Sequence, residues 1–192
     1  MSDFPPVRAQ AQLEANRFRS GVSESLMQVY AGSTNFQNYF NYQKFDFKLF
    51  GFYNAVATPF YFDGLDIFEF NSAIIDVWAW CEYGGSSGTT TFDVQIETSP
   101  GSGWTSIFTT QPSIAYNATG ASDGCWVGVV NAGLVGPEYF PPTYTAPANT
   151  VRPVLSSVAN SITAWTGIRA LLTSVQGGQP KDCGIMIRAR NI

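Results

Sequence analysis

Histidine is absent from the 192 residues of this sequence. Its absence excludes the serine–histidine and cysteine–histidine pairs that activate many nucleophiles, and it removes the commonest general base of enzymes. Only carboxylate chemistry, lysine chemistry or no chemistry remains for the chain. We therefore expect a protein that is not an enzyme and that has no catalytic residue.

Cysteine is scarce as well, and the three cysteines are Cys81, Cys125 and Cys183. An odd number leaves at least one thiol unpaired, and buried free thiols fit this composition best. There is no Cys-x-x-Cys motif, and without histidine the usual ligand set of a zinc site is missing. We expect no metal ion and no cofactor.

The acidic residues Asp63, Asp66 and Glu69 are the remaining candidates for a calcium site or a catalytic carboxylate pair. A calcium loop needs several converging oxygen ligands at fixed spacing, and this segment lacks that pattern. Glycosidase carboxylates come from separate strands, so no spacing in the sequence identifies such a pair. With many acids in the chain, one close pair is expected by chance.

Long apolar runs are also missing. No segment approaches the roughly 18 uncharged residues of a membrane span. The first residues include Asp3, Pro5 and Pro6 and contain no apolar stretch of the kind found in a secretory signal. We expect a protein that is made in a cytosol, stays soluble there and does not bind a membrane.

Charge is sparse and segregated. Charged residues make up 12% of the chain, about half the usual ~25%. No lysine or arginine occurs from Leu49 to Val151, a segment with nine acids, whereas all ten basic residues lie in the flanks. The simpler explanation is that flanking strands pair with middle strands inside one molecule, and the alternative is that the flanks reach a neighbouring subunit. An acidic chain without a basic cluster is a poor nucleic-acid binder.

The first 35 residues differ from the rest of the chain. They are small and polar, with a thin apolar stripe that could support at most a short helix. We expect residues 1–35 to form an extended arm or short helix that becomes ordered when it binds a partner, and residues 36–192 to form a single domain. The arm residues that we expect to contact a partner are Arg8, Arg17 and Arg19.

Aromatic residues are abundant in two places. Residues 36–62 contain twelve aromatic side chains, and a band of this size must be covered by the protein's own core, by another subunit or by stacked sugar rings. The second place is the Pro-rich loop 133–147. Together they supply the other predicted contact residues, which are Phe36, Tyr39, Phe40, Tyr42, Tyr139, Phe140 and Tyr144.

The remaining pattern is that of β-strands. Residues 65–82 are rich in β-branched and aromatic residues without Gly or Pro, which favours one buried strand or two strands joined by a bulge near Asn71, although a helix competes. Alternation of apolar and polar residues predicts strands at 44–48, 89–97 and 183–189. We expect further strands at 126–130, 151–158 and 163–175, a short strand or turn at 104–110, and a loop at 113–124. We predict an all-β, jelly-roll-like antiparallel β-sandwich with an extended N-terminal arm.

Four segments carry a resemblance to known proteins. They are DIFEFNSAI (66–74), GTTTFDVQIETSPG (88–101), WTSIFTTQPSI (104–114) and SVQGGQPKDCGIMIRARNI (174–192). In their order and combination they resemble the β-sandwich structural proteins of tailed bacteriophages, over about two-thirds of the chain. The resemblance implies a virion component made in the host cytoplasm, and it supplies no catalytic residue.

We accordingly expect a capsid decoration (cement) protein that forms a homo-oligomer, with a trimer favoured, and that binds the major capsid protein or other virion proteins. Added apolar contact area would stabilise the shell. The alternative is a tail, neck or fibre component that binds another virion protein or host-surface glycan through Trp104, Tyr139 or Tyr144.

Overall fold

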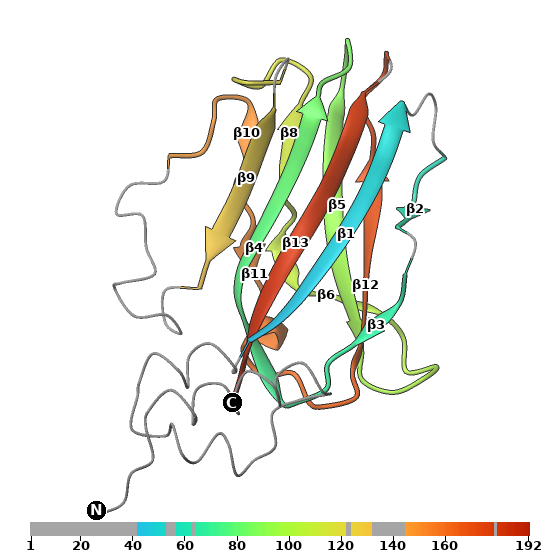
Figure 1. The fold of residues 1–192 in the computed structure, drawn as a ribbon, viewed down its shortest axis with the longest axis vertical. Helices are drawn as coiled ribbons and strands as arrows, with labels where there is room; N and C mark the ends of the chain where they lie inside the picture. The colour runs from blue at the N-terminus through green and yellow to red at the C-terminus, as the bar shows by residue number, and fades with distance from the viewer. Residues whose placement is uncertain (1–41, 53–56, 63, 122–123, 132–144, 179) are drawn as a thin grey trace, which may run out of the picture. The chain divides into compact units, whose positions relative to one another are not determined.

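The computed structural model describes residues 42–52, 57–62, 64–121, 124–131, 145–178 and 180–192. They form two main antiparallel β-sheets that lie in separate layers (Figure 1), and no α-helix occurs among them. The prediction of an all-β sandwich is confirmed. The predicted arm, residues 1–35, lies outside the described residues.

One layer is a four-stranded sheet in which β4 and β13 are the central strands. Ten residue pairs connect β4 with β13, from Lys181 opposite Tyr83 to Asn191 opposite Ser72. The order of the strands across this sheet is β1 (Tyr42–Phe52), β13 (Lys181–Asn191), β4 (Ser72–Tyr83) and β9 (Cys125–Val130).

The other layer is a seven-stranded sheet with shorter edge strands. Its order is β10 (Thr150–Val151), β8 (Ser113–Ala115), β5 (Thr89–Glu97), β12 (Gly167–Ser174) and β2 (Phe60–Tyr61). β3 (Asp66–Ile67) also pairs with β12, and β6 (Thr105–Ser106) pairs with β5. A separate pair consists of β7 (Phe108–Thr110) and β11 (Val154–Leu155).

The order of the strands is that of a jelly roll. Taken along the chain, the eight principal strands are β1, β2 with β3, β4, β5, β8, β9, β12 and β13. The four-stranded sheet holds the first, eighth, third and sixth of these, and the second sheet holds the second, seventh, fourth and fifth. The first and last strands are therefore neighbours, as in a double Greek key.

The core lies between the two sheets. Alternate residues of β5 point inward, so that Phe92 and Val94 are fully buried while Gln95 on the opposite face is partly exposed. Phe45 of β1 meets Phe68 edge to face, with 4.8 Å between the ring centroids. The alternation of apolar and polar residues in the sequence of β5 thus marks the buried face of this strand correctly.

The segment 65–82 forms two strands in different sheets. β3 pairs with β12 of the seven-stranded sheet, whereas β4 lies in the four-stranded sheet. The chain crosses from one layer to the other between them, where Phe68 enters the core. Of the two alternatives, one strand or two strands joined by a bulge, the structure has two strands, and a crossing between sheets joins them in place of a bulge near Asn71.

Two further predictions need correction. The predicted loop 113–124 contains β8, which is held between β5 and β10. The predicted strand 151–158 is divided into the end of β10, β11 and a short 3₁₀ helix, η2 (Ser157–Asn160). Pro153 separates β10 from β11, since proline lacks the N–H that a continuous ladder needs.

The flanking charges meet the middle segment inside the molecule. Arg188 of β13 lies opposite Asp76 of β4, and its Nε donates to both carboxylate oxygens at 2.9 Å. The Asp76 side chain is only 2% exposed. At this pair, the simpler explanation of the segregated charge is confirmed.

Candidate functional site

Three tryptophans share the outer face of the four-stranded sheet. Trp78 and Trp80 of β4 alternate with the buried residues Val77 and Ala79, so that their side chains point away from the core. On the neighbouring strand β9, Trp126 lies directly opposite Trp80. We call Trp78, Trp80 and Trp126 the tryptophan face.

A glycine lies beneath each of the two indoles of β4. Gly128 of β9 is opposite Trp78, and a Cβ atom at this position would overlap Trp78 Cε3 and would lie 2.6 Å from Cδ2. Gly184 of β13 is opposite Trp80, and a Cβ there would overlap Trp80 Cζ2 and lie 2.6 Å from Cη2. Each ring therefore lies over the backbone of a neighbouring strand, in a space that only a glycine at that position leaves open.

The tryptophan face is partly open to solvent. Trp126 is 49% exposed and meets Trp78 edge to face, with 5.2 Å between the ring centroids. Lys48 of β1 holds its Nζ 6.0 Å from the Trp80 ring centroid, at the limit of a cation–π contact. Large aromatic side chains of this kind, bordered by a cation, are typical of protein contact surfaces.

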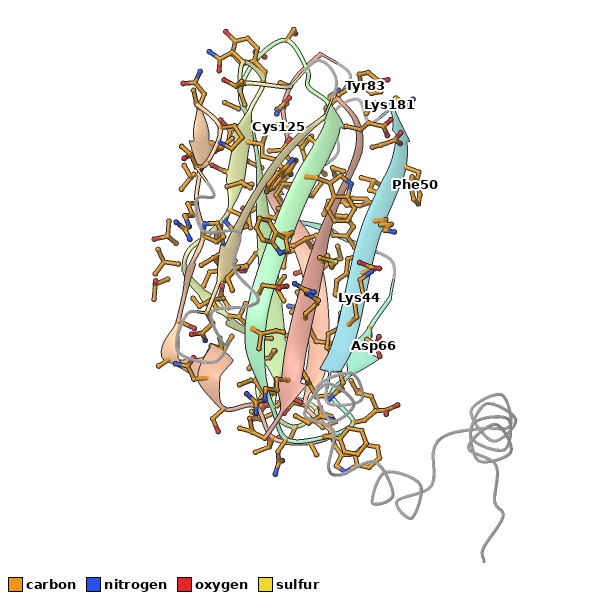
Figure 2. All side chains as sticks on the ribbon, turned by 60° about the vertical axis from the view of Figure 1, so that its left-hand side comes forward. Lys44, Phe50, Asp66, Tyr83, Cys125 and Lys181 are labelled. Atoms are coloured by element: carbon orange, nitrogen blue, oxygen red, sulfur yellow. The ribbon has the colours of Figure 1, made fainter. Side chains whose placement is uncertain are left out.

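More aromatic surface lies along the same sheet. Phe50 projects from β1 and is 74% exposed (Figure 2). Tyr83 and Lys181 lie together at the ends of β4 and β13, and Lys181 Nζ is 5.0 Å from the tyrosine ring centroid. Phe50 thus extends the aromatic surface of the outer face, and the Tyr83–Lys181 pair lies at one end of the sheet.

The outer face of the seven-stranded sheet carries a different arrangement. Arg169 of β12 lies between two rings, with its Cζ 4.0 Å from the Trp104 centroid and 4.7 Å from the Tyr61 centroid. Gln95 Oε1 accepts hydrogen bonds from Arg169 Nε at 3.0 Å and from Nη2 at 2.7 Å. Because Arg169 joins side chains from β2, β5 and the turn before β6, we interpret this cluster as a structural tie.

One end of the sandwich presents an exposed turn. Trp165 is 72% exposed and has a φ of +66°, which a bulky residue rarely adopts. Its N–H donates to Phe68 O at 2.7 Å, and Ala164 N–H donates to Asn71 Oδ1 at 2.9 Å. These bonds hold the turn in place and leave the Trp165 side chain exposed.

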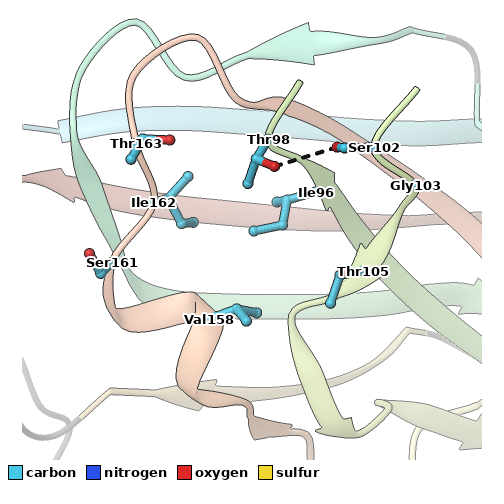
Figure 3. A pocket seen from close by; sticks show the side chains of 9 residues that line it. All are labelled: Ile96, Thr98, Ser102, Gly103, Thr105, Val158, Ser161, Ile162 and Thr163. Atoms are coloured by element: carbon cyan, nitrogen blue, oxygen red, sulfur yellow. Dashed lines mark hydrogen bonds between the residues drawn. The ribbon is translucent and has the colours of Figure 1, made fainter. Parts of the chain in front are cut away.

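A small cavity of about 240 Å³ lies beside this turn (Figure 3). Ile96 and Ile162 point into it, and Thr98 bonds to Ser102 at its rim, with 3.4 Å between the two hydroxyl oxygens. The volume is below the ~300–1,000 Å³ of most small-molecule sites. None of the lining residues is ionisable, so the cavity offers no acid–base chemistry. The lining residues are Ile96, Thr98, Ser102, Gly103, Thr105, Val158, Ser161, Ile162 and Thr163.

The three cysteines form a row on the inner face of the four-stranded sheet. Cys81 lies opposite Cys183 on one side and opposite Cys125 on the other, and all three are buried and form no disulfide. Burial raises the pKa of the Cys81 thiol well above its usual value, and the neighbouring Cys183 raises it further. Burial also raises the pKa of Cys125. Thiols that keep their protons are poor nucleophiles and metal ligands.

Other titratable groups are held by structural contacts. The Gly51 N–H donates to Asp182 Oδ1 at 2.5 Å and lowers the pKa of this carboxyl. Within the described ranges, no group of three or more Cys, Asp or Glu residues is placed to hold a metal ion.

Nearly all of the contact residues predicted from the sequence fall outside the described part of the chain. Tyr42 begins β1. The other nine fall in residues 1–41 and 132–144, outside the described part of the chain, and their roles stay predictions. They are Arg8, Arg17, Arg19, Phe36, Tyr39, Phe40, Tyr139, Phe140 and Tyr144.

The sequence pattern did not single out the tryptophan face or Trp165. The run 73–80 contains so few polar residues that it predicts a largely buried strand. The signal that could have separated its two faces is size, since small or β-branched residues at Val77 and Ala79 alternate with Trp78 and Trp80. Trp104 is one of three residues named for the glycan alternative, and Arg169 Cζ lies 4.0 Å from the centroid of its ring.

The comparisons with known proteins add no relative. No helix among the described residues is both long and apolar enough to span a membrane. No family model, no curated protein and no solved structure matches the chain. The resemblance to phage structural proteins therefore stays a prediction from the sequence.

Proposed function

We propose that this protein is a non-enzymatic virion structural protein, and specifically a capsid decoration protein that oligomerises on a phage head and stabilises the shell. The observation that carries the proposal is the tryptophan face, an aromatic contact surface on a jelly-roll sandwich. Jelly rolls are a common architecture of capsid proteins. The four sequence segments that resemble phage structural proteins support the same role.

The physical argument concerns buried area. Trp126 and the rings beside it lose apolar exposure when a partner covers them, at about 25 cal/mol per Å². Tryptophan is among the residues that dominate binding energy at interfaces. Lys48 at the border of the face can meet an acidic group of the partner, which would fix the orientation of docking. The expected partners are the major capsid protein or other virion proteins, and the protein would be located in the virion.

The test is binding of the purified full-length chain to DNA-free shells assembled from the major capsid protein of the same virus. The change is Trp126→Ala, which removes an exposed ring and leaves the core untouched. Loss of a central tryptophan contact costs about 2 kcal/mol or more, so the dissociation constant should rise by roughly 30-fold. Co-sedimentation over a range of protein concentrations measures it.

The matched control is Trp165→Ala, which removes an even more exposed tryptophan at the end of the sandwich. Shell binding should be unchanged in this variant. Failure of the unaltered protein to bind shells would overturn the decoration role. Binding to host-surface polysaccharide in its place would favour the tail, neck or fibre alternative.

A further inference from the structure

Strand β1 forms one edge of the four-stranded sheet along its whole length. It pairs with β13 on one side, and no described strand pairs with it on the other. At 11 residues it is as long as β13. A long open edge is a template for pairing with another strand, so the question is which strand would fit.

The backbone geometry shows which residues face the open edge. Gly51 N–H points toward β13 and donates to the side-chain Oδ1 of Asp182. Phe47 O also points toward β13, because a Cβ atom added at Gly184 would lie 2.6 Å from it. In an antiparallel ladder the N–H and C=O of one residue point to the same side, and successive residues alternate. The odd-numbered residues therefore bond toward β13, and Lys44, Asp46 and Lys48 present their backbone groups to the open edge.

The side chains of the same strand are divided by face. Phe45 and Phe47 are each 4% exposed and belong to the core. The outward residues are Lys44, Asp46 and Lys48, followed by Phe50 near the other end of the strand (Figure 2). The charge pattern on the outer face is thus plus, minus, plus, apolar.

This pattern is complementary to itself in the register that pairs the full strand. Phe47 is the midpoint of Tyr42–Phe52. Antiparallel pairing about Phe47 places Asp46 opposite Lys48 of the second copy, and Lys48 opposite its Asp46. Pairing about Asp46 would put lysine opposite lysine and aspartate opposite aspartate, which is destabilising. Full overlap and charge complementarity therefore select one register.

We propose that β1 pairs antiparallel with β1 of a second copy of this chain, about a twofold axis at Phe47, so that one sheet runs through both copies. Each contact then occurs twice, as an isologous interface requires. Pairing of the outward-facing residues supplies about eight backbone hydrogen bonds. A dimer of this kind differs from the trimer favoured from the sequence. The proposal concerns self-association in solution and does not rest on the virion role.

The experiment measures the mass and dissociation constant of the full-length protein by sedimentation equilibrium. The unaltered chain should be a dimer. Asp46→Lys should weaken the dimer by at least about tenfold, because lysine then lies opposite Lys48 of the second copy. Lys48→Asp should do the same by placing two aspartates opposite each other. The double exchange of both residues should restore the dimer.

Two further variants test the register and the backbone pairing one at a time. Lys44→Glu should leave the dimer intact, because in the proposed register Lys44 lies opposite Phe50 and its ion pair with Asp46 is within one strand. In a register centred on Phe45, Lys44 would lie opposite Asp46 of the second copy, and its reversal would weaken the dimer. Lys48→Pro removes an N–H that faces the open edge and spares the ladder to β13. It should abolish the dimer, whereas Lys48→Ala should retain it in part.

Near-ultraviolet circular dichroism of the tryptophans checks that each variant remains folded. A monomeric or trimeric unaltered chain would overturn the proposal. So would single exchanges that remain fully dimeric, or a double exchange that fails to restore pairing. These outcomes concern self-association, and Trp126→Ala tests shell binding separately.

Discussion

At the scale of single residues, burial decides the chemistry of the cysteine row. Cys81 lies between Cys183 and Cys125 on the inner face of the sheet, and burial is the largest cause of its raised pKa. The folded state thus keeps a proton that the unfolded state loses near the ordinary thiol value of 9.0. A raised pKa in the folded state contributes stability that is present at lower pH and is lost as the pH rises above that value.

We expect Cys81→Ala to flatten the alkaline loss of stability. In the unaltered chain the free energy of unfolding should fall above about pH 9, and the part due to one retained proton is about 1.4 kcal/mol per pH unit. The variant should lack this part of the slope. Urea unfolding at pH 8, 9 and 10 measures it.

Val77→Ala is the control, because Val77 is equally buried and has no titratable proton. This variant should lower the free energy of unfolding by a similar amount at each pH. Identical slopes of unfolding free energy against pH in all three proteins would contradict the argument.

At the scale of elements, the short strands depend on ties from distant parts of the chain. Gln176 follows β12 and is 2% exposed. Its Oε1 accepts from Gly85 N–H at 2.6 Å, and its Nε2 donates to Ile114 O of β8 at 2.7 Å. One side chain thus satisfies backbone groups of the loop after β4 and of a three-residue strand. This tie helps to explain why β8 forms in a segment whose sequence predicted a loop.

Replacing this side chain should loosen both segments together. Gln176→Leu leaves the Gly85 N–H and the Ile114 carbonyl without their partner, and we expect a loss of about 2–4 kcal/mol from the free energy of unfolding. Gln111→Leu is the control, because Gln111 is half-buried and accepts a single bond from Thr173. That variant should lose about 1 kcal/mol or less. Equal losses of unfolding free energy in the two variants, measured by urea unfolding, would contradict the argument, because they would show that the two Gln176 hydrogen bonds stabilise the fold no more than the single Gln111 bond.

At the scale of the whole molecule, the described core is contained within one unit of the chain. The compact unit Gln43–Ile192 includes the buried residues from Phe45 to Ala189. The strand β1 that we propose as the self-pairing edge belongs to this unit, apart from Tyr42. Folding and self-association should therefore both be properties of the sandwich.

Removal of residues 1–35 tests this directly. We expect the shortened chain to unfold within about 4 °C of the full-length protein, which corresponds to ~1 kcal/mol for a domain of this size. Its mass in solution should remain that of a dimer. A much lower unfolding temperature would show that the first residues complete the fold. A folded monomer would assign self-association to the arm and would contradict pairing through β1.

Local patterns in the sequence determined the class of this protein's fold and several of its strands. Alternation in β5 and in β13 states which side chains face the core, because a strand repeats every two residues whatever it pairs with. The missing histidine and the spacing of the cysteines limited the chemistry that the chain can perform. Those inferences needed only the identity of each residue and its near neighbours.

The tertiary structure alone decided the surfaces on which the proposals depend. That Gly128 and Gly184 lie beneath Trp78 and Trp80 follows from the register between strands that are distant in sequence. That β1 is an edge follows from the order of all the strands in its sheet. Strand pairing joins backbone groups that every residue has, so a strand's own sequence does not name its neighbours. Which indole is exposed, and which edge is open, is settled only when the two sheets pack.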